Sequence, residues 1–222
     1  MALLRDDQVT LNPSGGGGMD AWTKAIAIAG LAMSSFDASA QVIVRDLVDG
    51  MAAGTVTLES PSGTGASSGS SLEAVLTNRT ARDVHLDVYL AEPLFFANRG
   101  AGQNMVALAV YHGDGGYRSD GTRSFITLPG GKSSKVVFIA YCADFEKENP
   151  TPQDTFDLEQ APVDLIEVTE RITAYSKANP DRDITAAAQV AIWLQRGHSA
   201  EEIAEKFRFT ASDEQLAKEL LK

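Results

Sequence analysis

Residues 84–90, with the sequence VHLDVYL, carry the pattern that most restricts the fold of this chain. Apolar and polar residues alternate strictly, as they do in a strand with one buried and one wetter face. The apolar set that would share the buried face is Val84, Leu86, Val88 and Leu90. A helix does not sort residues with this period of two. The segment therefore predicts a half-buried β-strand.

Further short strand patterns surround this one. Strand signals begin with QVIVRDLV at residues 41–48 and recur in residues 54–60, 71–80 and 103–111. Residues 60–70 are rich in glycine and serine, which predicts a loop or linker, and Pro93 predicts an interruption. Two more strands flank a Pro-Gly-Gly turn before Cys142. Strands at this spacing predict a mainly β fold, an antiparallel immunoglobulin-like β-sandwich over residues 41–160.

The composition and the spacing of apolar residues change after Cys142. Residues 144–162 form an acidic, proline-containing connection, and Pro162 suits the first turn of a helix. Apolar residues then recur at helical spacing, and residues 184–197 predict a second helix ending at Gly197. Ser199 and Glu202 have the spacing of a capping box. Residues 161–222 are therefore expected to be a helical appendage packed on the sandwich.

The N-terminal part of the chain divides into two segments. Residues 1–18 are a polar arm that ends in four glycines, which predicts a flexible joint, and they do not resemble a signal peptide. Residues 19–40 allow two interpretations. Trp22, Ile26, Ala29 and Met33 share one face of an amphipathic helix, which we favour. The alternative is a signal-like segment, because a short apolar run precedes Ala-Ser-Ala.

The net charge and the cysteine count of the 222 residues argue against several kinds of function and site. The net charge of −11 argues against binding nucleic acid through phosphate contacts. Cys142 is the single cysteine, so an intrachain disulfide and an all-cysteine zinc site are both excluded. Nothing in the sequence is long and apolar enough to predict a membrane span. We predict no cofactor.

Several short motifs are weak. Gly-Lys-Ser at residues 131–133 is not a P-loop, because Ile126 takes the place of the first P-loop glycine. Asp114 and Asp120 are possible calcium ligands in a turn-rich loop, but a solvated turn explains them more simply. Asn78-Arg79-Thr80 matches a glycosylation sequon. The sequence has neither a G-x-S-x-G elbow nor an H-E-x-x-H helix, so we expect a protein that is not an enzyme.

Cys142 and Gln189 form the informative pair. Cys142 ends an apolar strand, and Gln189 lies in the apolar helix segment AAAQVAIWL. A buried amide without partners costs about 1–3 kcal/mol, so something must satisfy Gln189. One interpretation is a hydrogen bond to main chain or water, with Cys142 acting as a small core residue.

The second interpretation comes from a resemblance. Residues 141–144, Tyr-Cys-Ala-Asp, and residues 188–193, Ala-Gln-Val-Ala-Ile-Trp, resemble two motifs of the bacterial thioester-domain (TQXA) family of surface adhesins. Ala188 stands where the family motif has threonine. The resemblance implies an internal thioester between Cys142 and Gln189, formed with loss of ammonia and able to acylate an amine of a partner. It also implies a cell-envelope or extracellular location.

Apolar neighbours would shield such a bond from water, and Tyr141 and Trp193 are the candidates for that role. We therefore expect a binding or adhesion module of thioester type that acts on a protein partner. The alternative is a structural module without this chemistry, which self-associates through exchange of the arm, residues 1–18.

Overall fold

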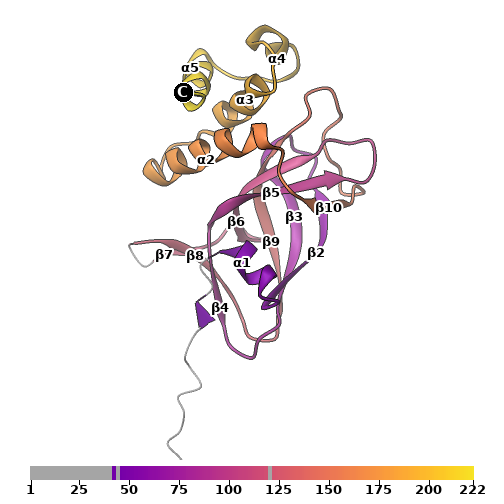
Figure 1. The fold of residues 1–222 in the computed structure, drawn as a ribbon, viewed down its shortest axis with the longest axis vertical. Coiled ribbons are helices and arrows are strands. Elements are labelled where there is room, and N and C mark those ends of the chain that lie inside the picture. The colour runs from indigo at the N-terminus through magenta and orange to yellow at the C-terminus, as the bar shows by residue number, and fades with distance from the viewer. Residues whose placement is uncertain (1–41, 44–45, 120–121) are drawn as a thin grey trace, which may run out of the picture. The chain divides into compact units, whose positions relative to one another are not determined.

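The computed structural model describes residues 42–43, 46–119 and 122–222. Our predictions for the arm, residues 1–18, and for the helix or signal-like segment, residues 19–40, lie outside the described residues. The described part is mainly antiparallel β, with two sheets and several helices (Figure 1). The prediction of strands up to Cys142 and helices from residue 163 is confirmed.

The larger sheet has six strands in the order β10-β5-β6-β9-β3-β2, all antiparallel neighbours. Their bounds are β2 Val56–Gly63, β3 Ser68–Asn78, β5 Tyr89–Asn98, β6 Met105–His112, β9 Ser133–Cys142 and β10 Phe156–Glu159. The smaller sheet has the order β1-β4-β8-β7, and its strands are β1 Val42–Ile43, β4 Val84–Asp87, β7 Arg118–Ser119 and β8 Ser124–Leu128. β1 pairs with β4 in parallel.

The two sheets meet at Val88, between β4 and β5. Its N–H donates to the carbonyl oxygen of Ser124 at 2.9 Å, in the smaller sheet. Its own carbonyl accepts from the N–H of Val110 at 2.7 Å, in the larger sheet. The four apolar side chains predicted to be buried over residues 84–90 are all buried, but His85 on the other face is buried as well, so the burial alternates only in part. One extended segment therefore contributes to both sheets.

Four helices follow the sheets and lie together beside the larger one (orange to yellow in Figure 1). They are α2 Val163–Ala178, α3 Thr185–Gln195, α4 Ala200–Lys206 and α5 Ala211–Leu220. α3 contacts α2, α4 and α5 as well as β3 and β9, so residues 187–193 are buried on every side of the helix. The capping box between Ser199 and Glu202 is confirmed at the start of α4.

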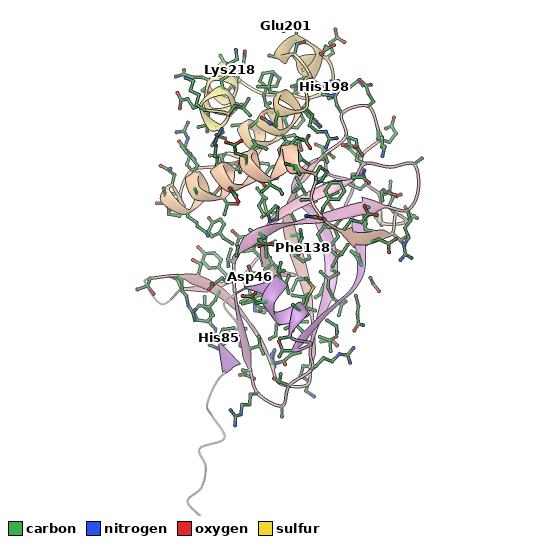
Figure 2. All side chains as sticks on the ribbon, in the orientation of Figure 1. Asp46, His85, Phe138, His198, Glu201 and Lys218 are labelled. Carbon is green, nitrogen blue, oxygen red and sulfur yellow. The ribbon has the colours of Figure 1, made fainter. Side chains whose placement is uncertain are left out.

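The sheets and the helices share one hydrophobic core and belong to one compact unit. Phe138, at the middle of β9, has no exposed surface, and it lies 5.4 Å from the ring of Phe96 (Figure 2). Apolar residues of α3 belong to the same cluster as those of β9. The helical segment is thus part of the domain.

Residues 47–52 form a helix, α1 Leu47–Ala52, where the sequence predicted a continuing strand. Asp46 decides this locally, because its side chain accepts from the N–H of Val48 at 2.7 Å and caps the helix. The same carboxylate accepts from the N–H of Ala91 at 2.6 Å, which ties α1 to β5 (Figure 2). The N-cap hydrogen bond of Asp46 and its second bond to β5 override the local strand propensity.

The prediction of a loop or linker over residues 60–70 holds only for residues 64–67, because strands occupy the rest of the range. β2 continues to Gly63 and β3 begins at Ser68, with a register shift between Glu59 and Ser62. A Cβ atom at Gly63 would lie 2.5 Å from the carbonyl carbon of Pro150. This glycine therefore permits close approach of two backbones. From composition alone, the same glycine predicts a flexible segment.

Pro93 does not interrupt its strand, and the acidic connection contains a strand that we did not predict. The pairing of β5 with β6 is irregular between Tyr89 and Leu94, so Pro93 lies where the ladder lapses and its missing N–H is tolerated. β10 lies within residues 144–162 and pairs with β5 at an edge of the larger sheet. Only Phe156 of β10 is buried, and the next three residues are exposed. The sequence therefore shows no clear alternation of apolar residues that would have predicted this strand.

Candidate functional site

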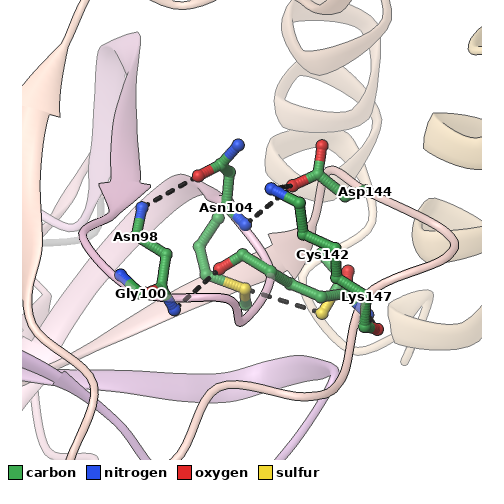
Figure 3. Close-up of polar contacts among 8 residues, drawn as sticks. Asn98, Gly100, Asn104, Cys142, Asp144 and Lys147 are labelled. Carbon is green, nitrogen blue, oxygen red and sulfur yellow. Dashed lines mark hydrogen bonds and ion pairs between the residues drawn. The ribbon is translucent and has the colours of Figure 1, made fainter.

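Cys142 lies at the last position of β9, paired with Met105 of β6. Its side chain has no exposed surface, and its Sγ lies 3.6 Å from the Sδ of Met105, which is equally buried (Figure 3). Burial, and secondarily the charge of Asp144, raise the pKa of the thiol well above its ordinary value. The thiol is therefore protonated at neutral pH, and a protonated thiol is a poor nucleophile.

Gln189 contacts Cys142, as the sequence pairing expected, but it does so through the main chain of Cys142. The N–H of Cys142 donates to Oε1 of Gln189 at 2.9 Å, and Nε2 of Gln189 donates to the carbonyl oxygen of Cys142 at 2.9 Å. The same N–H also lies 2.9 Å from the carbonyl oxygen of Ser67. The amide of Gln189 has no exposed surface, and its acceptor and one donor are both satisfied.

This pair of hydrogen bonds joins α3 to the end of β9. It extends the hydrogen bonding of the larger sheet into a side chain of a helix, where a side-chain amide takes the role of a neighbouring strand. We call this arrangement the Cys142–Gln189 clamp. These contacts match the first interpretation of Gln189, an amide whose hydrogen bonds are made with the main chain.

Asp144, the last residue of the Tyr-Cys-Ala-Asp motif, has a structural role. The carboxylate of Asp144 accepts from the N–H of Asn104 at 3.0 Å and lies 2.9 Å from Nζ of Lys147 (Figure 3). Asn104 in turn accepts from the N–H of Asn98 at 2.8 Å. Asp144 therefore holds the turn between β5 and β6 beside Cys142.

Tyr141 and Trp193 are both buried near the clamp, each 3% exposed. Burial, and secondarily Asp183, raise the pKa of Tyr141. The ring of Trp193 packs edge-on against Phe145 at 5.3 Å and Phe207 at 5.4 Å. Both side chains are thus core residues, and their role in shielding Cys142 and Gln189 from water stays a prediction.

The remaining candidates take structural positions. Asp114 caps its own turn, because its Oδ1 accepts from the N–H of Gly116 at 2.8 Å, and Asp120 lies outside the described residues. Among the residues that the structure describes, no three His, Cys, Asp or Glu side chains gather as metal ligands. Asn78 is 1% exposed and donates to the carbonyl oxygen of Leu128 at 2.9 Å, so the sequon asparagine is not accessible in the folded chain.

A second feature, which we did not predict, lies beside the corner at Val88. A cavity of about 540 Å³ is bounded by the ends of β4 and β6, by β7 and by the end of α2, and a smaller one of about 190 Å³ adjoins it toward α3. Tyr89, Tyr111 and Pro180 line both. Tyr117 completes the larger cavity and Tyr141 the smaller. We call the two together the tyrosine cleft, because four of the five tyrosines of the chain line it.

The rings in the cleft contact one another. Tyr111 and Tyr117 lie edge to face at 5.7 Å with an interplanar angle of 74°. Nζ of Lys177 lies 5.7 Å from the ring centre of Tyr89, in a cation–π position. Burial, followed by the nearby Tyr89 and Tyr117, raises the pKa of Tyr111 to about 12. The hydroxyl of Tyr111 is therefore a neutral hydrogen-bonding group at every physiological pH.

Among the described residues that line the larger cavity, Arg123 and Lys177 are cations and Asp87 is a carboxylate. Arg123 lies 3.7 Å from Asp87, and Lys177 is exposed at the rim. The sequence held one signal for this site, since Tyr89 takes a polar-side position in VHLDVYL. The approach of Tyr117 and Lys177 to it depends on tertiary packing.

Comparison of the chain with models of protein families, with curated proteins and with solved structures finds no match. Within the described residues, no helix has the length and apolar character required to cross a membrane. The candidate functions therefore depend on the geometry of the two sites.

Proposed function

We propose that this chain is a non-catalytic protein-binding module, built on an immunoglobulin-like sandwich, whose tyrosine cleft receives the partner. One observation carries the proposal: four tyrosines from three strands and a loop gather at one cleft with Lys177 at its rim. Tyrosines supply large, rigid contact area together with a hydroxyl, and they are enriched at the centres of protein interfaces.

The accessibility of the cleft supports the same proposal. Tyr117 is 53% exposed, one of few large apolar side chains that stand out of the described surface. The ring of Tyr117 is half exposed, and its contact with Tyr111 already restricts its rotamers. Covering this ring with a partner therefore costs little further side-chain entropy. The buried thiol and the satisfied amide of the clamp offer no comparable surface.

Display selection tests the proposal directly. A library of random peptides is selected on the wild-type chain and counter-selected on the double variant Tyr117→Ala, Lys177→Ala. Both side chains are exposed, so the variant is expected to fold. Peptides that bind the wild type and not the variant support the module. Selection that yields no variant-sensitive peptide contradicts it.

A second candidate is the thioester adhesion module that the resemblance implies. The contact between Gln189 and Cys142 supports it, because proximity is the first requirement for condensation. The reaction requires the thiol to leave Met105 and attack the amide carbon, so that a C–S bond replaces the C–N bond and the thiol proton leaves with the amide nitrogen as ammonia. The intact mass of the purified chain tests this, since a thioester lowers the mass by one ammonia and an unreacted clamp leaves it unchanged.

Assembly by exchange of the arm is a further alternative. The short parallel pairing of β1 with β4, Val42 opposite Val84 and Ile43 opposite His85, supports it, because an N-terminal segment adds a strand to that edge. Its test is the oligomeric state after truncation, which is described below.

A further inference from the structure

We infer that the smaller cavity of the tyrosine cleft receives one aromatic ring that carries a hydroxyl, presented as a tyrosine side chain of the partner. This inference deepens the proposed function and rests on it. Four properties of the smaller cavity carry it: the hollow that the strand register leaves, the volume, the hydroxyl of Tyr141 and the balance of charge.

The hollow forms around a small side chain on the larger sheet. Ala109 of β6 lies between Tyr89 of β5 and Ile139 of β9 in the register of that sheet. Tyr111 and Tyr141 follow two positions further along β6 and β9, so they share this face. All five side chains line the smaller cavity. One small residue among four large ones therefore leaves a space above the sheet.

The end of α2 and the connection from α2 to α3 form the opposite wall. Residues 179, 180 and 182–185 line the cavity from this side. The side-chain amide of Asn179 donates to the carbonyl oxygen of Tyr175 at 3.0 Å, and Oδ1 of Asp183 accepts from the N–H of Thr185 at 2.9 Å. These bonds order the connection, so the cavity is formed before a ligand enters and binding costs little ordering of the chain.

The volume of the smaller cavity suits one ring. A cavity of about 150 Å³ with apolar walls holds a molecule of benzene. The volume here is about 190 Å³, which leaves room for a ring with one small substituent. Its walls include the rings of Tyr89 and Tyr111 and the aliphatic side chains of Leu108 and Ile172. Such walls favour an aromatic ring over a polar chain.

The hydroxyl of Tyr141 selects the substituent. Tyr141 is 3% exposed, and its hydroxyl makes no hydrogen bond to any residue that the structure describes. Burial, followed by Asp183, Tyr111 and Tyr89 of the same cavity, raises the pKa of this hydroxyl, so the hydroxyl lies on the cavity side. A buried hydroxyl without a partner is costly, and a ligand that satisfies it binds more tightly. A phenol both donates and accepts, so it matches the Tyr141 hydroxyl in either orientation.

The charges at the smaller cavity favour a neutral ligand. Among the described residues that line it, Arg182 is the one cation and Asp183 the one carboxylate. Nη1 of Arg182 donates to the hydroxyl of Tyr175 at 2.5 Å, and Asp183 accepts from Thr185, so each charged group already has a partner. A neutral phenol leaves both of these interactions in place, whereas a charged ligand would compete for one of them.

A ligand-observed NMR titration of the whole chain with p-cresol, which is the side chain of tyrosine, tests the inference. Toluene is the reference probe, because it lacks only the hydroxyl. We expect saturable binding of p-cresol and about fivefold weaker binding of toluene. Tyr141→Phe removes one oxygen atom and should bring the two affinities to within about twofold of each other. Tyr117→Phe is the matched control, since Tyr117 lines only the larger cavity, and it should keep the wild-type preference.

A second variant tests the hollow itself. Ala109→Leu fills the space above the sheet and should weaken p-cresol binding at least about tenfold in a chain that circular dichroism shows to be folded. If this variant does not fold, Tyr141→Phe decides the matter alone. The inference is overturned if the wild type binds toluene as tightly as p-cresol, if Tyr141→Phe keeps the preference, or if Tyr117→Phe loses it.

The display selection separates failure of this inference from failure of the proposed function. Each tyrosine of the variant-sensitive peptides is replaced with alanine, and we expect one such replacement in each peptide to weaken binding about tenfold. Variant-sensitive peptides that bind equally well without tyrosine would sustain the binding module and overturn the tyrosine ligand. Absence of any variant-sensitive peptide would remove both, and p-cresol binding would then mark a site for a free small phenol.

Discussion

Replacing Gln189 with glutamate tests the Cys142–Gln189 clamp through pH. A protonated carboxyl reproduces both hydrogen bonds, because its carbonyl oxygen accepts from the N–H of Cys142 and its hydroxyl donates to the carbonyl oxygen of Cys142. An ionised carboxylate has no donor and places a charge where the residue has no exposed surface. Burial of this kind raises the pKa of a carboxyl above its ordinary value of about 4.3.

The magnitude follows from proton linkage. Between the pKa of the unfolded chain and the raised pKa of the folded chain, the folded state holds a proton that the unfolded state has lost. The free energy of unfolding therefore falls as pH rises, by up to about 1.4 kcal/mol per pH unit. From pH 5 to pH 7 the Gln189→Glu chain should lose up to about 2.7 kcal/mol relative to the wild type over the same range. Near pH 4 the two should differ by no more than about 1 kcal/mol, the worth of one imperfect hydrogen bond.

Urea unfolding at a series of pH values measures this, with tryptophan fluorescence as the signal because Trp193 lies on the same helix. Gln195→Glu is the matched control, since it makes the same chemical change at an exposed position of α3. Its stability should follow the wild type across the pH range. If Gln189→Glu also follows the wild type, the amide does not make the two buried bonds, and the clamp is refuted.

Three further predictions concern the cap, the arm and the thiol. Ser199→Ala should lower the free energy of unfolding by about 1 kcal/mol in urea denaturation, because it removes the N-cap acceptor of Glu202 in α4; a loss no larger than that of Ser212→Ala would contradict the role of the cap. Deleting residues 1–18 should leave the thermal midpoint unchanged, and size-exclusion chromatography should show a smaller species if the arm drives assembly; an unchanged elution volume would remove that alternative. Cys142 should react slowly with a thiol reagent in the native chain and at once in urea, because burial raises its pKa and blocks access; immediate labelling of folded protein would contradict the buried position.

The sequence alone determined the elements whose signals are local. Alternation over residues 84–90 needs only the period of a strand, and the box of Ser199 and Glu202 needs only four consecutive residues, so both were predictable. Gln189 was also predictable as a buried amide in need of partners, because an apolar run surrounds it in sequence. What it contacts was not predictable, since the same chain is consistent with a bond to the thiol or to the main chain of Cys142.

Tertiary structure decided the features that depend on partners distant in the chain. Gly63 resembles a residue of a flexible linker until Pro150 is seen against it, and Pro93 resembles a strand breaker until the irregular ladder beside it is known. Tyr89, Tyr111 and Tyr117 gather only because the chain changes sheets at Val88 and the end of α2 packs over that corner. Periodicity records which face of an element is buried. Which elements bury each other, and therefore where a cleft opens, is set by long-range packing that no local pattern contains.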